Sequence, residues 1–141
     1  KNIGGYFPVN NEIDDLDILK EFEKRKYKIC LPVVKDNFGM DFYNFSFKDP
    51  LTINKYGIPE PQKTNVIYPD IILIPMVGFD KNLNRLGYGK GYYDRTISKL
   101  RKLKKIFVIG LAYDNQMVRN IPVENHDEKM DIILTDKKIY R

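Results

Sequence analysis

Residues 69–100 read PDIILIPMVGFDKNLNRLGYGKGYYDRTISKL, and this stretch decides the fold. Its apolar run over residues 71–77 predicts a buried strand, and residues 80–84 predict a turn. Three alternating glycines and a helical pattern of apolar residues follow; these are Gly87, Gly89, Gly91, Tyr93, Ile97 and Leu100. The sequence therefore predicts a strand, a glycine loop and a helix in that order.

This order suits a phosphate, because the first N–H groups of a helix lack partners within the helix and carry the positive end of its dipole. Arg85 and Lys90 offer positive charge in the loop, and Asp94 offers a hard oxygen for a divalent metal. The glycine spacing matches neither the P-loop nor the dinucleotide fingerprint. From these residues alone, an anion site and a glycine-rich connection with solvated charges are equally open.

Five segments carry a resemblance to a known family. Residues 78–80 read GFD and residues 84–94 read NRLGYGKGYYD. The others are YGIPEP at residues 56–61, VIGLAY at residues 108–113 and IPVENHD at residues 121–127. Together they closely resemble the 5-formyltetrahydrofolate cyclo-ligase family, also called methenyltetrahydrofolate synthetases. The resemblance covers nearly all 141 residues.

The alternation of strands and helices predicts an α/β fold with a mainly parallel twisted sheet and helices on both faces, a three-layer, Rossmann-like arrangement. Further strands are expected at residues 28–34, 40–46, 105–113 and 131–136. Ile13, Leu16, Leu19 and Phe22 predict another helix, for which Asp14 or Asp15 is a plausible cap. Ligands of such sheets bind at the carboxyl ends of strands, so the glycine loop and residues 115–127 are expected to face one crevice.

Length and composition indicate one globular domain over residues 1–141, with 43% hydrophobic and 30% charged residues. No apolar run is long enough for a membrane span, and no export signal is visible, so we expect a cytoplasmic monomer. The single cysteine, Cys30, lies in a strand pattern and is expected to be buried and inert. The chain begins at Lys1 without methionine, and the resemblance implies that an amino-terminal helical segment contributing to the ATP site is missing.

The net charge of +5 is compatible with anionic substrates. The basic run at residues 99–105 is interpreted as the solvated face and end of a helix rather than as a nucleic-acid site. A nucleic-acid-binding module, resting on this charge and on Tyr88, Tyr92 and Tyr93, is the competing hypothesis from another class. We expect no nucleic-acid partner and no membrane partner.

The resemblance implies a site residue by residue. The ATP-binding residues would be Arg85, Leu86, Gly87, Tyr88, Gly89, Lys90, Gly91, Tyr92 and Tyr93, with Arg85 and Lys90 also catalytic. Asp94 and Asp127 would hold Mg²⁺ beside the triphosphate, although a loop acid such as Asp127 is usually just solvated. The folate-binding residues would be Glu12, Phe7, Tyr56, Tyr88 and Tyr92.

Other readings of these residues are simpler. Glu12 suits the first turn of a helix, residues 49–64 suit a passive connection, and the lone His126 suits the surface, with no catalytic role. The activity implied is the ATP- and Mg²⁺-dependent cyclisation of 5-formyltetrahydrofolate to 5,10-methenyltetrahydrofolate, with release of ADP and phosphate, through phosphorylation of the formyl oxygen. The alternative is a non-catalytic folate- or nucleotide-binding relative, or an inactive fragment.

Overall fold

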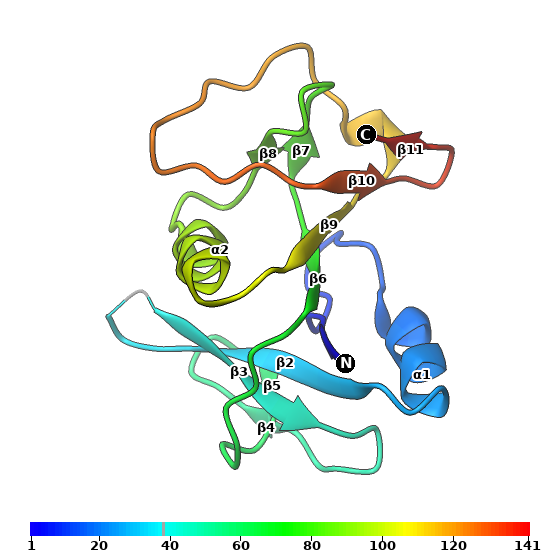
Figure 1. Cartoon of the computed structure of the whole chain (residues 1–141), viewed down its shortest axis with the longest axis vertical. Helices are drawn as coiled ribbons and strands as arrows, with labels where there is room; N and C mark the ends of the chain where they lie inside the picture. The colour runs from blue at the N-terminus through cyan, green and yellow to red at the C-terminus, as the bar shows by residue number, and fades with distance from the viewer. Residues whose placement is uncertain (38) are drawn as a thin grey trace.

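The structure is a computed structural model that describes residues 1–37 and 39–141 (Figure 1). A seven-stranded sheet forms its centre. From one edge to the other, its strands are β11 (Ile139–Tyr140), β10 (Ile132–Leu134), β9 (Phe107–Leu111), β6 (Ile71–Pro75), β1 (Asn2–Gly4), β2 (Lys28–Val34) and β3 (Met40–Phe45). The five inner strands are parallel, and β11 and β3 are antiparallel edges. The predicted mainly parallel sheet is confirmed.

Two helices cover opposite faces of this sheet (Figure 1). On one face, Ile97 and Leu100 of α2 (Tyr92–Leu103) pack with Ile72 and Ile74 of β6. On the other face, Leu19 of α1 (Leu16–Lys24) packs in a cluster with residues of β1, β2 and β6. The alternation of side chains along β6 divides its apolar run between the two cores, as a strand buried on both faces requires.

The main departure in secondary structure follows β6, which ends at Pro75 rather than at the predicted residue 77. The chain there leaves the sheet and forms a small antiparallel hairpin, β7 (Gly78–Phe79) with β8 (Arg85–Leu86). Val77 donates its backbone N–H to Leu86 O at 2.8 Å, so this residue belongs to the hairpin. The predicted turn at residues 80–84 lies at its tip, where the buried Asp80 carboxylate accepts the backbone N–H groups of Asn82 and Asn84.

The first helix also begins later than its apolar periodicity indicates. Ile13 lies in the preceding loop, where its carbonyl accepts a hydrogen bond from the Tyr6 hydroxyl at 2.6 Å. Asp15 is the N-cap residue, as predicted, but its side chain makes no capping hydrogen bond. Asp14 instead accepts the Leu16 N–H. The Asp15 carboxylate is therefore available for another contact, described below.

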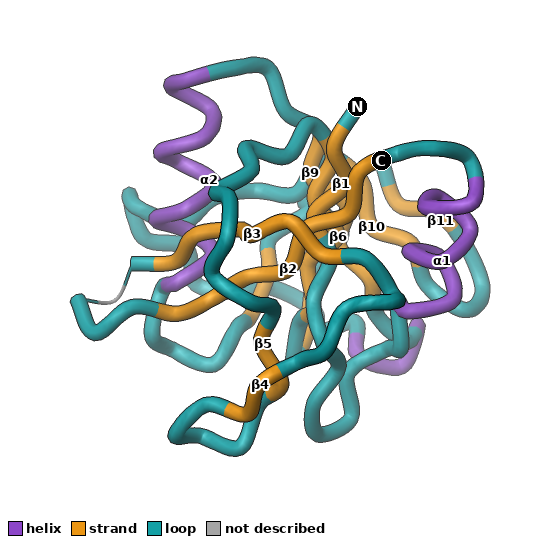
Figure 2. Tube along the Cα trace, turned by 90° about the horizontal axis from the view of Figure 1, so that it is seen from below, coloured by secondary structure: helices purple, strands orange, loops and turns teal. Residues whose placement is uncertain are grey.

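The remaining elements are short. A hairpin of β4 (Thr52–Ile53) and β5 (Pro59–Glu60) lies beside β2, outside the main sheet (Figure 2). A 3₁₀ turn, η1 (Asp114–Gln116), follows β9. Cys30 is buried as predicted, and burial raises the pKa of its thiol well above the usual value. Within residues 1–37 and 39–141, no helix has the length and apolar character needed to cross a bilayer.

Candidate active site

A cleft of about 640 Å³ opens at the carboxyl ends of β2 and β6. The loop after β1, the β4–β5 hairpin, the glycine loop and the segment before β10 all contribute to its walls. Every residue that the sequence predicted for the site lines it: Phe7, Glu12, Tyr56, Arg85, Leu86, Gly87, Tyr88, Gly89, Lys90, Gly91, Tyr92, Tyr93, Asp94 and Asp127. The two loops expected to face one crevice do so, while the roles of individual residues stay predictions.

The cleft has two chemically different sides. We call residues 6–12 and 54–60 the hairpin side, and residues 85–94 and 121–127 the glycine-loop side. Aromatic and apolar groups and two glutamates line the hairpin side. The glycine-loop side also carries aromatic residues, Tyr88, Tyr92 and Tyr93, but it differs by its basic residues, its glycines, the amino end of α2 and a neighbouring group of acidic residues.

The glycine loop carries the chain into α2 through backbone conformations that other residues rarely adopt. Gly89 has φ +91° and Gly91, the N-cap of α2, has φ +70°. Both lie in the left-handed region, where the absence of Cβ removes the steric penalty. The loop therefore brings the first backbone N–H groups of α2 to the cleft, which is the arrangement that an anion site uses.

Arg85 is the most firmly held cation of this loop. Its Nε donates to the Pro75 carbonyl at 3.0 Å, and its guanidinium lies 5.1 Å from the centroid of the Tyr93 ring. Burial lowers the pKa of Arg85, while the nearby acidic side chains of Asp94 and Glu12 favour its charged form. A Cβ at Gly87 would lie 2.7 Å from Arg85 Nη2, so a side chain there would displace the guanidinium. Pro75, the last residue of β6, thus holds the positive charge of Arg85 in the cleft.

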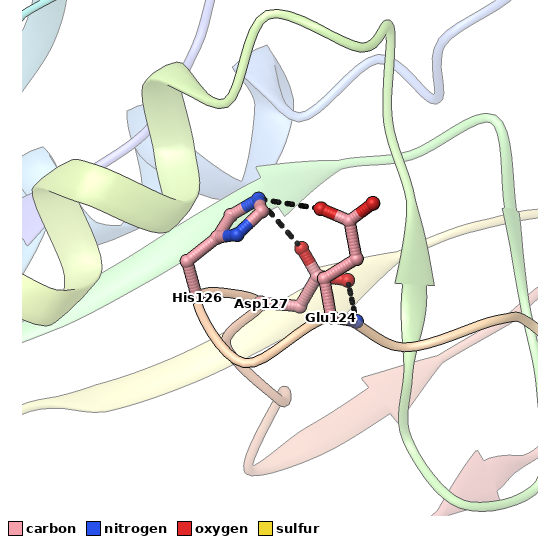
Figure 3. A group of neighbouring side chains, drawn as sticks. All are labelled: Glu124, His126 and Asp127. Carbon is pink, nitrogen blue, oxygen red and sulfur yellow. Dashed lines mark hydrogen bonds and ion pairs between the residues drawn. The ribbon is translucent and has the colours of Figure 1, made fainter.

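Acidic side chains gather at the far end of the glycine-loop side. Asp94, in the first turn of α2, accepts the backbone N–H of Glu128 at 3.1 Å. Asp127 accepts the Glu124 N–H at 2.9 Å, and its other oxygen lies 3.5 Å from His126 Nε2. The same imidazole nitrogen lies 3.2 Å from Glu124 Oε2, so the three side chains converge (Figure 3).

This donor set suits a hard divalent cation. Glu124, His126 and Asp127 each offer one ligand atom, all within 4.8 Å of one another, and Asp94 lines the same cleft. Carboxylate oxygens are the ligands that Mg²⁺ prefers in proteins. The sequence prediction named Asp94 and Asp127 but missed Glu124 and gave His126 no role. The short spacing of Glu124, His126 and Asp127 in IPVENHD was the available signal.

On the hairpin side, Glu12 is held by its own loop. Its Oε1 accepts the Val9 N–H at 2.8 Å, and its backbone N–H donates to Val9 O at 3.1 Å. Burial raises the pKa of Glu12, and hydrogen bonding to Val9 and Tyr88 partly opposes that shift. The carboxylate lines the cleft, where it can accept paired donors from a ring.

Asn54 shapes the other wall of the hairpin side. Its Oδ1 accepts the backbone N–H groups of Tyr56 at 2.8 Å and Ile58 at 3.0 Å. Its Nδ2 donates to Glu60 Oε2 at 3.1 Å. Residues 54–60 therefore form a wall of the cleft, with Tyr56 exposed on it. Glu60 was missed, although a carboxylate between two prolines was a visible signal.

Comparison with known proteins identifies the family. The sequence model of the 5-formyltetrahydrofolate cyclo-ligase family matches residues 1–136. The chain belongs to this family. It is 36% identical to a probable 5-formyltetrahydrofolate cyclo-ligase of Schizosaccharomyces pombe, over 84% of this chain and 66% of that protein. It is also 36% identical to a 5-formyltetrahydrofolate cyclo-ligase of Haemophilus influenzae, over 95% of this chain and 75% of that protein.

Two solved structures of the family have the same fold. A 5,10-methenyltetrahydrofolate synthetase from Mycoplasma pneumoniae superposes with a TM-score of 0.76 at 31% identity, over 97% of this chain and 74% of that one. The 5,10-methenyltetrahydrofolate synthetase of Aquifex aeolicus gives a TM-score of 0.81 at 31% identity, over the whole of this chain and 71% of that one. This chain therefore spans about two thirds to three quarters of the length of these four family members.

Proposed function

We propose that this chain cyclises 5-formyltetrahydrofolate to 5,10-methenyltetrahydrofolate with consumption of ATP and release of ADP and phosphate. One observation carries the proposal: the family signature, the acidic group and the Glu12 loop line a single cleft. Its volume, about 640 Å³, lies within the range of about 300–1,000 Å³ that is usual for small-molecule sites. The two chemically different sides suit two different substrates.

The reaction has to activate a poor electrophile. The formyl oxygen attacks the γ-phosphorus of ATP, a new P–O bond forms and the bond to ADP breaks. N10 of the folate then attacks the formyl carbon and loses its proton, and phosphate departs with its bonding electrons to leave the methenyl bridge. In phosphoryl transfer, the protein contributes chiefly by positioning the reactants and by stabilising the charge that develops.

The residues of the glycine-loop side support the first step. Lys90 and Arg85 neutralise the charge that develops on the transferred phosphoryl group, and Arg85 is already fixed by Pro75 and Tyr93. The backbone of the loop and the start of α2 hold phosphate oxygens. The predicted ATP residues Leu86, Gly87, Tyr88, Gly89, Gly91, Tyr92 and Tyr93 form the surface around them.

Asp94 and Asp127 would hold Mg²⁺ in this scheme, with Glu124 and His126 beside them. When bound, the ion would neutralise part of the charge of the triphosphate. The contacts of Asp94 with Glu128 and of Asp127 with Glu124 orient the two carboxylates.

The folate would bind between the hairpin side and Tyr88 and Tyr92 of the glycine-loop side. Glu12 would accept the paired N–H donors of the pterin ring, and the aromatic residues would contact its faces. The candidates for those aromatic contacts are Phe7, Tyr56, Tyr88 and Tyr92.

The test is to mix the chain with 5-formyltetrahydrofolate, ATP and Mg²⁺ and to follow the near-ultraviolet absorbance of the methenyl product. Asp94→Asn is the control, and we expect it to form little product. Nucleotide binding without folate-dependent release of phosphate would contradict the proposal and favour the non-catalytic alternative. Product formation by parent and variant alike would remove Asp94 from the mechanism.

A further inference from the structure

A buried carboxyl group lies beneath the loop that carries Phe7 and Glu12. Asp15 is fully buried, and its Oδ2 accepts the backbone N–H of Tyr6 at 2.9 Å. Among the described residues, its Oδ1 is buried without a hydrogen-bond partner. Burying an acid with one oxygen unsatisfied lowers the stability of the fold, so a functional reason for this position should be sought.

The carboxyl group is tightly enclosed from both sides. A Cβ added at Gly5 would lie 2.8 Å from Asp15 Oδ2 and 2.5 Å from Leu19 Cδ1. The Gly5 N–H donates to Cys30 O at 3.0 Å, which fixes this point of the loop to β2. Asp15 therefore connects α1 to the start of the loop at the sheet.

The far end of the same loop is closed by two further contacts. The Tyr6 hydroxyl donates to Ile13 O, and Glu12 holds Val9 through both its carboxylate and its backbone N–H. Tyr6 thus donates its backbone N–H to Asp15 and its hydroxyl to the Ile13 carbonyl. The segment between them presents Phe7, Val9 and Glu12 to the cleft.

We propose that Asp15 is a positioning residue for the folate side of the cleft: by holding Tyr6, it places Phe7 and Glu12 and so sets the affinity for the folate. The inference rests on the proposed function. A capping role does not account for the carboxylate, because it makes no hydrogen bond to the first turn of α1.

The ionisation of Asp15 supplies a readout that a purely structural role would lack. Burial raises the pKa of Asp15 to about 7, against the hydrogen bond from the Tyr6 N–H. The ionisable groups facing it are Asp14 and Glu12 of its own loop, Tyr6 across the loop and Tyr93 of α2. Above neutral pH, the Asp15 carboxyl group is ionised, and its Oδ1 then carries part of a negative charge without a hydrogen-bond donor among the described residues. This buried charge disfavours the conformation in which residues 6–12 pack against Asp15.

The experiment compares the parent with Asp15→Asn and Asp15→Ala, using Asp17→Asn as a matched control. Asp17 is an exposed acid in the first turn of α1. Equilibrium binding of 5-formyltetrahydrofolate is measured by calorimetry at about pH 6 and about pH 8.5, together with KM for folate and for ATP, because these conditions bracket the titration of Asp15.

We expect Asp15→Ala to weaken folate binding about tenfold at both pH values, since it leaves the Tyr6 N–H without an acceptor. Asp15→Asn keeps an acceptor without charge. It should match the parent near pH 6 and bind folate about three- to tenfold more tightly than the parent near pH 8.5. KM for ATP should stay within about twofold in every variant, because the hydrogen bond of Asp15 is to Tyr6 and not to the glycine-loop side.

Two results would overturn the inference alone. One is a parent that binds folate and an Asp15→Ala variant that binds it equally well. The other is an Asp15→Asn variant with the pH profile of the parent, which decides the question even when Asp15→Ala does not fold. A parent that binds no folate at either pH would overturn the proposed function and this inference with it.

Discussion

The two sides of the cleft are built by different kinds of contact. On the hairpin side, each loop is closed by hydrogen bonds between near neighbours in sequence, such as Val9 with Glu12 and Asn54 with Tyr56. On the glycine-loop side, Asp127 is likewise held by its near neighbour Glu124, but contacts between distant segments are added. Asp94 accepts the Glu128 N–H, 34 residues away, and Arg101 pairs with Glu128, 27 residues away.

The glycines differ in the same way. Gly5 on the hairpin side is needed for space, since a side chain would collide with Leu19 and Asp15. Gly89 and Gly91 on the glycine-loop side are needed for positive φ; a Cβ at Gly89 would meet nothing within 4 Å, and one at Gly91 would reach only the Arg95 side chain, at 3.5 Å. One side is shaped by close packing against a helix, and the other by the backbone path into a helix. Changes on each side should therefore affect different steps.

The largest expected effect is on the glycine-loop side. Lys90→Ala should lower kcat by about 100-fold or more, because it removes a charge from the developing phosphoryl group. The melting temperature should stay the same, since the Lys90 side chain is exposed and its carbonyl still accepts Arg95 Nη1. Steady-state kinetics and a thermal melt test this, with the exposed Lys81→Ala as control. An unchanged rate would remove Lys90 from the mechanism.

The next effect is on the hairpin side. Glu12→Gln should raise KM for 5-formyltetrahydrofolate by about tenfold or more, because a charged hydrogen-bond acceptor is lost. KM for ATP should change less, because Glu12 reaches the ATP residues only through Tyr88 and the charge of Arg85. Glu21→Gln, an exposed acid of α1, is the control. Equal loss of affinity for both substrates would contradict the separation of the two sides.

Glu12 also predicts an acid limb in folate binding. Because burial raises the pKa of Glu12, its carboxylate is lost at a higher pH than that of an exposed glutamate. Folate affinity should therefore fall as the pH is lowered through that pKa, and Glu12→Gln should flatten the fall. Calorimetric titrations of folate binding across the acid range would measure this fall. If Glu12→Gln shows the same fall as the parent, a group other than Glu12 is responsible for it.

A smaller effect should follow from loosening the acidic group. Arg101 Nη1 lies 2.8 Å from Glu128 Oε1, and its Nη2 donates to Lys129 O at 3.0 Å. Arg101→Ala should raise the Mg²⁺ concentration for half-maximal activity about fivefold, because it frees the segment that carries Asp127. Folate KM should not change. The neighbouring Lys102→Ala is the control, and a matching effect there would indicate a general charge effect.

The last prediction concerns stability rather than ligand binding or catalysis. Since the pKa of Asp15 rises from its ordinary 3.8 to about 7 on folding, the folded chain holds this proton more tightly than the unfolded chain. The free energy of unfolding contributed by Asp15 should therefore fall as the pH rises through that window. Asp15→Asn should be more stable than the parent by at most about 4 kcal/mol near pH 8 and nearly equal to it near pH 4. Thermal melts of the parent and Asp15→Asn at the two pH values test this prediction, with Asp17→Asn as the control. A parent that becomes more stable as the pH rises would contradict it.

Local patterns were enough to predict much of the fold. The strand at residues 28–34 was predicted with its observed bounds, because an apolar run between charged residues marks both of its ends. The turn at residues 80–84 and the helix after Gly91 follow from residue types that act locally. The start of α1 was misplaced because Ile13 fits the helical period, while its carbonyl is taken by Tyr6 through the fold.

The sequence by itself determined the alternation of strands and helices, the glycine loop, and the residues that carry a phosphate-binding signal. Those features depend on periodicity and on backbone freedom, which neighbouring residues specify. Only the tertiary structure decided that Asp94 meets Glu128 and so lies beside the short acidic segment of residues 124–127. It also decided that Asp15 is buried with one oxygen that has no hydrogen-bond partner among the described residues. Burial and contacts between distant segments depend on the order of strands in the sheet, and no local pattern encodes that order.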